Sequence, residues 1–234
     1  MPIASVPDHV AVAVPHLGTA AARWRGLGGE WASPLLRDEQ AGFGTRQLRY
    51  RGGAKLELLE PVGDDSFAAA FVARFGARIH HVTLTVPELL PAVGTLRDEG
   101  YDVVDVFAEG DVWHEGFLRP SQVGGMIVQV AWSGRTDEQW ASTMDEPLRE
   151  PSPTAARLIG PTLTHPDRDA ARRLWCSLGA EVAEDGDALV VGWPGAALDV
   201  RVEPGPTAGP VGLRFEGASS LADDPVLGPA TLPA

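Results

Sequence analysis

Two segments of the chain carry a histidine in nearly the same sequence context. In DHVAVAVPHL and HHVTLTVPEL the second residue is a histidine, His9 and His81 respectively. Two more polar residues lie in apolar surroundings, Glu57 within KLELL and Gln129 within MIVQV. Burying a carboxylate is costly unless it is paired, hydrogen-bonded or bound to a metal. Imidazoles, a carboxylate and an amide oxygen form a mixed ligand set that suits a divalent first-row metal. We therefore expect these four residues to share one metal ion.

The two histidine segments are predicted to be the first strands of two sister modules. HVAVAVP and HHVTLTVP alternate valine or leucine with small or polar residues, which is typical of a strand with one apolar face. A helical pattern ending at glycine follows each of them, in LGTAAARWRGLGGE and ELLPAVGTLRDEGY. Further strands come next, TRQLRY and KLELLEP in the first module, and YDVVDVF, EGFLRP and MIVQVAW in the second. Because His9 and His81 are 72 residues apart in matching positions, we interpret the modules as an internal duplication.

The duplicated pattern appears a third time, without its histidine. In this copy GPTLTHP aligns with HVAVAVP, so that Gly160 stands where the other copies have a histidine. We expect an α+β protein built from these modules. The expected organisation is a domain over residues 1–133 with modules at 5–65 and 78–133, a polar linker at 134–156, a third ligand-less βαβββ-like module at 157–220, and a loose tail at 221–234.

With these motifs the chain resembles the vicinal oxygen chelate superfamily, which includes glyoxalase I, bleomycin-resistance proteins, extradiol dioxygenases and methylmalonyl-CoA epimerases. The resemblance covers about residues 5–133 and is closest to the epimerases, whose ligand-bearing strands resemble DHVAVAVP, KLELLEP, HHVTLTV and FLRPSQVGGMIVQVAW in order. It implies paired βαβββ modules forming a metal-centred cup, to which this chain adds a third, degenerate module. It also implies one divalent ion (Co, Ni, Mn, Fe or Zn) with the ligands His9, Glu57, His81 and Gln129.

This resemblance implies a lyase or isomerase, with two departures from the epimerase pattern. Epimerases often have a glutamate where this chain has Gln129, and a catalytic glutamate before the first hairpin, where this chain has Gln47. Removal and return of a proton on opposite faces of a substrate needs two acid/base groups. We expect Glu57 to be both a ligand and the catalytic proton carrier. The metal would stabilise an enolate-like intermediate of a small carbonyl or carboxylate substrate that chelates it through oxygen.

Three residues are candidates for binding that substrate. Gln47 precedes the first hairpin, and the segment DVWHEGFLRP carries His114, Glu115 and Arg119 close to the predicted mouth of the cup. Loops hold functional residues disproportionately, and an arginine can bind a carboxylate or phosphate through two hydrogen bonds. We predict substrate contacts from Gln47, His114 and Arg119.

Two other functions fit parts of the same pattern. A protein of the resistance type would hold an antibiotic or metabolite in the cup without turnover, although four intact ligand positions argue against this function. An Fe(II) extradiol dioxygenase would use two histidines and one carboxylate as a facial triad, but Gln129 would then occupy a position that oxygen chemistry usually leaves open.

The composition limits the partners and the compartment. The 19 basic and 32 acidic residues give a net charge of −13, which repels phosphate backbones and makes nucleic acid an unsuitable partner. The only cysteine is Cys176, so no intramolecular disulfide can form, and the N-terminus lacks the features of a signal peptide. No apolar run is long enough to span a membrane. We expect a cytoplasmic protein that forms a homodimer, because an unpaired third module would expose a sheet edge.

Overall fold

The computed structural model describes residues 1–217, and the expected tail at 221–234 and the end of the third module lie outside the described residues. The described chain divides into two compact units. The first unit contains residues 1–9, 81–134 and 160–211, and the second contains residues 10–80, 135–159 and the described residues from 212 onward. Among residues 1–217, no helix has the length and apolar character that crossing a membrane requires.

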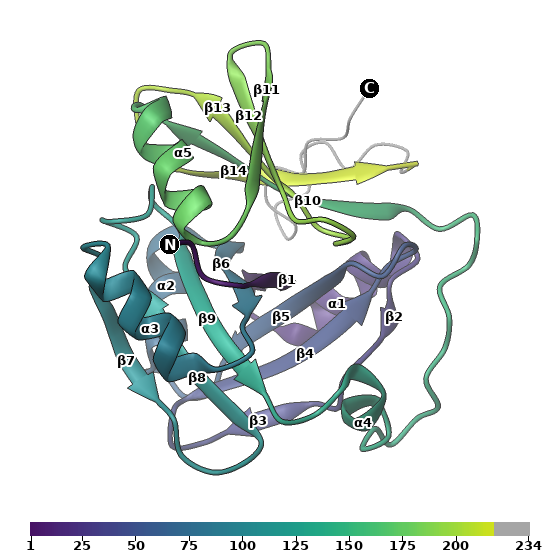
Figure 1. Ribbon diagram of the computed structural model, residues 1–234. Helices are drawn as coiled ribbons and strands as arrows, with labels where there is room; N and C mark the ends of the chain where they lie inside the picture. Colours follow the sequence, from purple (N-terminus) through teal and green to yellow (C-terminus); the bar gives the residue numbers. More distant parts are fainter. Residues whose placement is uncertain (218–234) are drawn as a thin grey trace. The chain divides into compact units, whose positions relative to one another are not determined.

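The first unit contains the second module from His81 onward, and the elements of this module follow the predicted order (Figure 1). Its elements are β6 (Arg78–Thr85), α3 (Leu89–Asp98), β7 (Val103–Phe107), β8 (Trp113–Leu118) and β9 (Ile127–Ser133). Strand β9 runs parallel to β6 and antiparallel to β8, which pairs with β7. Helix α3 packs against β7, β8 and β9. It buries four side chains at the spacing of one helical face: Leu89, Ala92, Val93 and Leu96.

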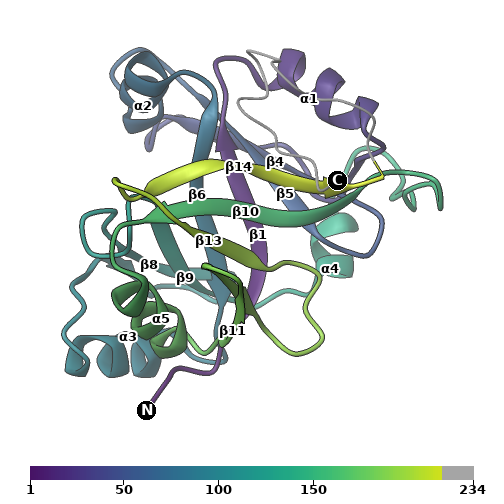
Figure 2. The same cartoon turned by 90° about the horizontal axis from the view of Figure 1, so that it is seen from above.

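The third module lies in the same unit for most of its length and forms a separate sheet. Its elements are β10 (Arg157–His165), α5 (Arg168–Ser177), β11 (Glu181–Asp185), β12 (Ala188–Gly192), β13 (Val200–Pro204) and β14 (Gly209–Glu216). Helix α5 begins where the Asp167 carboxylate accepts a hydrogen bond from Ala170 N. The strand order is β11-β12-β13-β10-β14, so that β13 and β14 flank β10 (Figure 2). Strand β14 thus forms one edge of this sheet, beside β10.

The second unit contains most of the first module. Its helix and strands are α1 (Leu17–Gly26), β2 (Glu30–Trp31), β3 (Leu36–Asp38), β4 (Phe43–Arg49) and β5 (Lys55–Pro61). A turn joins β4 and β5: Gly52 and Gly53 adopt φ of 89° and 96°, and Tyr50 N donates to Ala54 O. Positive φ values of this kind are open to glycine without strain.

The strands of the two sister modules belong to one sheet. Strand β1 (Val6–Ala13) begins the first module, and the nine-stranded sheet has the order β2-β4-β5-β1-β6-β9-β8-β7, with β3 beside β4. The two predicted first strands, β1 and β6, are therefore neighbours. The predicted fold class, α+β with paired βαβββ modules, is confirmed.

Helix α2 (Phe67–Phe75) and the short strands β2 and β3 are additions to the sequence-based assignment. Helix α2 begins at Ser66, whose hydroxyl accepts a hydrogen bond from Ala69 N. A small core forms in this unit from Ala13, Leu59 and Ala68, with three partly buried side chains packed against it, Phe43, Phe71 and Val72. The expected linker includes one short helix, α4 (Asp137–Ala141), which begins with a capping box between Thr136 and Gln139.

Candidate metal centre

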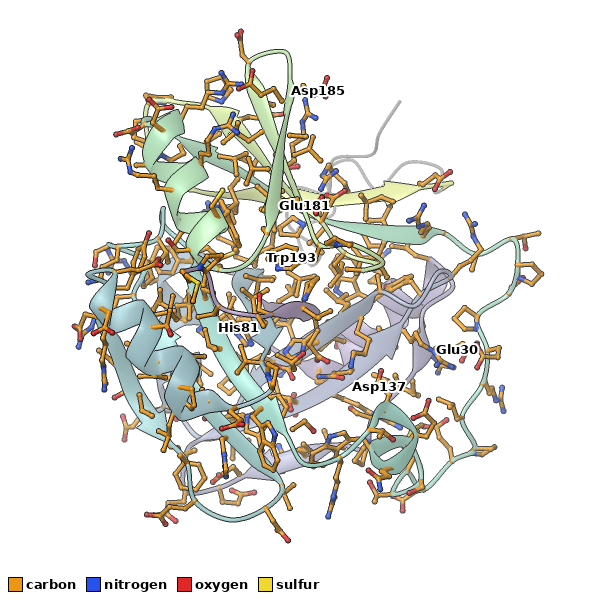
Figure 3. All side chains as sticks on the ribbon, in the orientation of Figure 1. Glu30, His81, Asp137, Glu181, Asp185 and Trp193 are labelled. Carbon is orange, nitrogen blue, oxygen red and sulfur yellow. The ribbon has the colours of Figure 1, made fainter. Side chains whose placement is uncertain are left out.

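The two histidines occupy equivalent places on their strands. His9 is the fourth residue of β1, and His81, labelled in Figure 3, is the fourth residue of β6. Their side chains are 2% and 6% exposed, and their ring centroids are 5.6 Å apart at an interplanar angle of 71°. Strand alternation directs both away from the apolar residues that line the other face. The structure therefore brings the two imidazoles together out of water, as a shared metal site requires.

A carboxylate fixes the orientation of His9. Asp8 Oδ2 lies 2.6 Å from His9 Nδ1, and the Asp8 side chain is 20% exposed. Because a carboxylate accepts hydrogen bonds, Nδ1 carries a proton in this pair, and in the neutral ring Nε2 then keeps its lone pair for a ligand. Histidines that bind metals commonly donate their other ring N–H to a carboxylate in this way. Asp8 thus orients the ring so that Nε2 is the candidate ligand atom of His9.

The atoms that Gln129 and His9 offer converge on one hydroxyl group. Thr83, which is fully buried on β6, has its Oγ1 3.0 Å from His9 Nε2. The same hydroxyl lies 2.5 Å from Oε1 of Gln129, a side chain that is 7% exposed. Thr83 is opposite Gln129 in the register of β6 and β9. Gln129 Oε1 and His9 Nε2 therefore point toward the same position from two strands.

A second carboxylate holds the other end of the Gln129 amide. Glu115 Oε2 accepts hydrogen bonds from Gln129 Nε2 at 2.7 Å and from the Trp113 indole Nε1 at 2.8 Å. On β8, Phe117 is opposite Gln129, and Glu115, two residues away, projects to the same face. The sequence predicts a strand that begins at Glu115, in EGFLRP, and in the structure Glu115 lies within β8, which begins at Trp113. This residue therefore belongs to the polar cluster around Gln129.

Glu57 completes a group of possible ligands. Each of His9, Glu57 and His81 offers one ligand atom, and the three atoms lie within 4.8 Å of one another. Glu57 is opposite Gln47 in the register of β4 and β5, and Gln47 Nε2 lies 3.5 Å from Glu57 Oε2. Gln47 is thus a neighbour of the candidate ligand Glu57.

These residues fit the metal that the sequence predicts. Imidazole nitrogens and carboxylate oxygens bind first-row metals at roughly 2.0–2.2 Å, so that two ligands on opposite sides of an ion are about 4.4 Å apart. The 4.8 Å limit for His9, Glu57 and His81 is close to that spacing. The hydrogen bond from Nδ1 of His9 and the directed amide of Gln129 are further signs of prepared ligands.

The predicted substrate-binding residues His114 and Arg119 have their described contacts with residues other than the four candidate ligands. His114 lies on the opposite face of β8 from Glu115, where its ring is 4.5 Å from that of Trp132 and its Nε2 is 2.9 Å from Gly110 O. Arg119 follows β8 and forms a 4.0 Å ion pair with Asp102, and both side chains are more than 60% exposed. The predicted roles of His114 and Arg119 in substrate binding stay predictions.

His80 precedes the candidate ligand but projects elsewhere. Its ring centroid lies 4.7 Å from that of Phe71 and 5.8 Å from that of Phe67, both on α2. Burial lowers the pKa of His80 to about 4, so the imidazole is neutral near pH 7. These contacts give His80 a packing role against α2.

The third module carries neither kind of candidate ligand at the matching positions. Gly160 is the fourth residue of β10, the place that His9 and His81 have on their strands. In register, Arg201 is opposite Thr162, as Gln129 is opposite Thr83 in the second module. Arg201 is held by Asp185 and Glu203, and these hydrogen bonds raise its pKa. A permanently charged arginine cannot act as a metal ligand.

The fold and the ligand cluster define a class of protein that the sequence comparisons confirm. Residues 8–117 match the glyoxalase/bleomycin resistance protein/dioxygenase superfamily. The chain is also 34% identical over 129 residues to an ethylmalonyl-CoA/methylmalonyl-CoA epimerase from Cereibacter sphaeroides, covering 94% of that protein and 53% of this chain. The chain therefore belongs to this superfamily, also called the vicinal oxygen chelate superfamily.

The more similar relatives within the superfamily are named epimerases. The mitochondrial methylmalonyl-CoA epimerase of Bos taurus is 34% identical over 129 residues, which cover 71% of that protein and 53% of this chain. A crystal structure of methylmalonyl-CoA epimerase from Mycobacterium tuberculosis superposes with a TM-score of 0.50 at 23% identity, over 55% of this chain and 87% of that one. A hypothetical protein from Staphylococcus aureus matches 94% of both chains with a TM-score of 0.66 at 10% identity, which shows a shared fold that extends to the third module.

Proposed function

We propose that this protein is a divalent-metal-dependent epimerase or a closely related isomerase, with His9, Glu57, His81 and Gln129 as the metal ligands. The grouping of three ligand atoms within 4.8 Å carries this proposal. The bound ion would supply Lewis acidity, which stabilises the negative charge that develops on a substrate oxygen when an adjacent carbon loses its proton. The names of the relatives support the epimerase class.

Glu57 has two roles in this proposal. As a ligand it provides the only carboxylate of the four proposed ligands, and as a base it takes up or returns the substrate proton. Gln47, 3.5 Å from Glu57, would donate a hydrogen bond that directs the carboxylate without carrying a proton itself. Gln47 and Gln129 occupy the places where the resemblance leads us to expect glutamates. The residues here therefore favour proton transfer at Glu57.

The proposed substrate is a small acid or thioester with two oxygens that can chelate one ion. The names of the relatives suggest branched malonyl-CoA thioesters as the first compounds to test. A carbon between a thioester and a carboxylate loses a proton to give an enolate, whose charge needs a Lewis acid or hydrogen-bond donors nearby.

The first experiment measures metal content. Elemental analysis of the purified protein is expected to give close to one equivalent of a divalent first-row metal. Less than about a tenth of an equivalent, with no uptake when Co(II), Ni(II), Mn(II), Fe(II) or Zn(II) is added, would refute metal dependence.

The second experiment follows proton exchange at the substrate carbon. Methylmalonyl-CoA is incubated in D2O with the metal-loaded protein, and loss of the α-proton signal is measured by NMR. Replacing Glu57 by glutamine is expected to reduce exchange at least about 100-fold, because general acid/base catalysis contributes about that much. Glu39→Gln is the matched control, since Glu39 is 77% exposed and the change removes the same charge. Full exchange activity in Glu57→Gln would contradict the role of Glu57.

The alternatives give different results in these experiments. Metal without exchange, but with tight binding of the thioester, would indicate a binding protein of the resistance type. Oxygen uptake with catechols after Fe(II) loading would indicate a dioxygenase.

A further inference from the structure

Glu115 is a half-buried carboxylate to which the sequence assigns no role. It lies on β8 and accepts two hydrogen bonds through the same oxygen, from Gln129 Nε2 at 2.7 Å and from Trp113 Nε1 at 2.8 Å. Both donors belong to the described strands β8 and β9, which pair in regular antiparallel register. Short strands in regular register hold side chains more precisely than loops do. The regular pairing of β8 and β9 thus fixes the positions of Glu115 and Gln129 relative to each other.

The chemistry of these groups determines which way the Gln129 amide faces. A carboxylate accepts hydrogen bonds and does not donate them, so the amide –NH2 must be the end that meets Glu115. The carbonyl oxygen, Oε1, is then directed to the other side, where it lies 2.5 Å from the Thr83 hydroxyl. That hydroxyl is 3.0 Å from His9 Nε2. Without Glu115, the amide nitrogen and oxygen could exchange places, and an –NH2 group cannot bind a cation.

We infer that Glu115 is a positioning residue that holds the Gln129 amide with its oxygen toward the two histidines, and so makes Gln129 competent as a metal ligand. This inference rests on the proposed function, because it requires a metal site at His9, Glu57, His81 and Gln129. It goes beyond that proposal by assigning the amide orientation to a residue that is not itself a ligand. Trp113 stabilises the arrangement by holding the same carboxylate oxygen.

The test compares metal affinity in variants of the full-length protein. Co(II) and Zn(II) are titrated into metal-free protein in competition with a chromophoric chelator. Glu115→Gln is expected to weaken binding about 10- to 100-fold, the usual effect of removing a partner that orients a ligand. Glu181→Gln is the control, because Glu181 is an exposed residue on β11 (Figure 3) and the change removes the same charge. The melting temperature of each metal-free variant reports whether the fold has survived.

A double variant tests the orientation directly. In Glu115→Gln combined with Gln129→Glu, an amide again meets a carboxylate across β8 and β9, and a carboxylate oxygen now takes the ligand position. Metal affinity is expected to return to within about threefold of the original protein or to exceed it, since a charged ligand replaces a neutral one. Failure of the double variant to regain affinity while it remains folded would overturn the inference.

The outcomes separate the inference from the proposed function. If the original protein binds neither Co(II) nor Zn(II), the proposed function fails. If the original protein binds and Glu115→Gln binds equally well, only the inference about Glu115 fails. If Glu115→Gln does not fold, the double variant decides the inference, because it keeps an amide opposite a carboxylate across β8 and β9.

Discussion

At Gly160 the backbone of the third module lies against the backbone of Asp199. The sister modules have a candidate metal ligand at the equivalent position. The φ of Gly160 is 141°, in the region that residues with a side chain rarely adopt. A Cβ built on Gly160 would lie 1.9 Å from Asp199 O and 3.0 Å from Asp199 C. The position equivalent to His9 and His81 is therefore filled by the chain before β13. No side chain fits there unless β10 and β13 move apart.

We predict that Gly160→Ala strongly destabilises the protein. The disfavoured φ costs about 1–3 kcal/mol. Relieving the overlap with Asp199 O adds about 1–3 kcal/mol, as overpacking of a dense interior does. The sum, about 2–6 kcal/mol, is a large part of the 5–15 kcal/mol that typically separates a folded domain from its unfolded state.

The assay is urea unfolding, followed by circular dichroism, of the original protein and two glycine variants. Gly192→Ala is the matched control, because Gly192 lies in β12 of the same module and a Cβ there would meet no atom within 4 Å. The control should change the free energy of unfolding by less than about 0.5 kcal/mol, as substitutions without such contacts usually do. If Gly160→Ala unfolds at the same urea concentration as the control, the steric argument is wrong. Gly160→His, which restores the residue of the sister modules, should not create a metal site, because the Asp199 backbone leaves no space for the side chain.

Three further predictions concern acidity, the ligand shell and assembly. Because burial lowers the pKa of His80 from 6.5 to about 4, the unfolded chain binds more protons between these values. Stability that is present above pH 6.5 is thus lost as the pH falls toward 4, by at most about 3.4 kcal/mol. Chemical unfolding of metal-free protein across this range should show the loss, and His80→Leu should show a smaller one. Asp8→Asn should weaken Co(II) binding about 10-fold, because a neutral amide supports the Nδ1 proton of His9 less well than a carboxylate does. Unchanged affinity in the same competition titration would contradict this role of Asp8. We also propose a homodimer, and a monomeric mass in solution scattering at micromolar concentration would refute it.

The elements that position the histidines could be predicted because their patterns are local. Alternation with a period of two marks β1 and β6, and the spacing of glycines marks the ends of α1 and α3. By contrast, β2 and β3 have two and three residues, too few to display an alternation. Helix α2 has the sequence FAAAFVARF, which is apolar around most of its circumference, and the sequence-based assignment gives it no element.

The candidate ligands follow from the sequence, whereas the groups that orient them do not. His9, His81, Glu57 and Gln129 stand out because each is polar within a repeated strand pattern. The partners of these residues depend on strand register, which sets which side chains meet across β6, β8 and β9. In the sequence, Glu115 is the first residue of the predicted strand EGFLRP, and nothing there pairs it with Gln129.

The sequence by itself determined a duplicated strand that carries a histidine, a third copy that lacks it, and one polar residue in each closing strand. These properties follow from the residue types and from their spacing along the chain, so they can be recognised without knowing which distant residues are in contact. Only the tertiary structure decided that the Asp8 carboxylate holds His9, that Glu115 holds the amide of Gln129, and that Asp199 excludes any side chain at Gly160. Each of these depends on distances of a few ångströms set by side-chain conformation, strand register or backbone packing, and no periodicity along the chain records such distances.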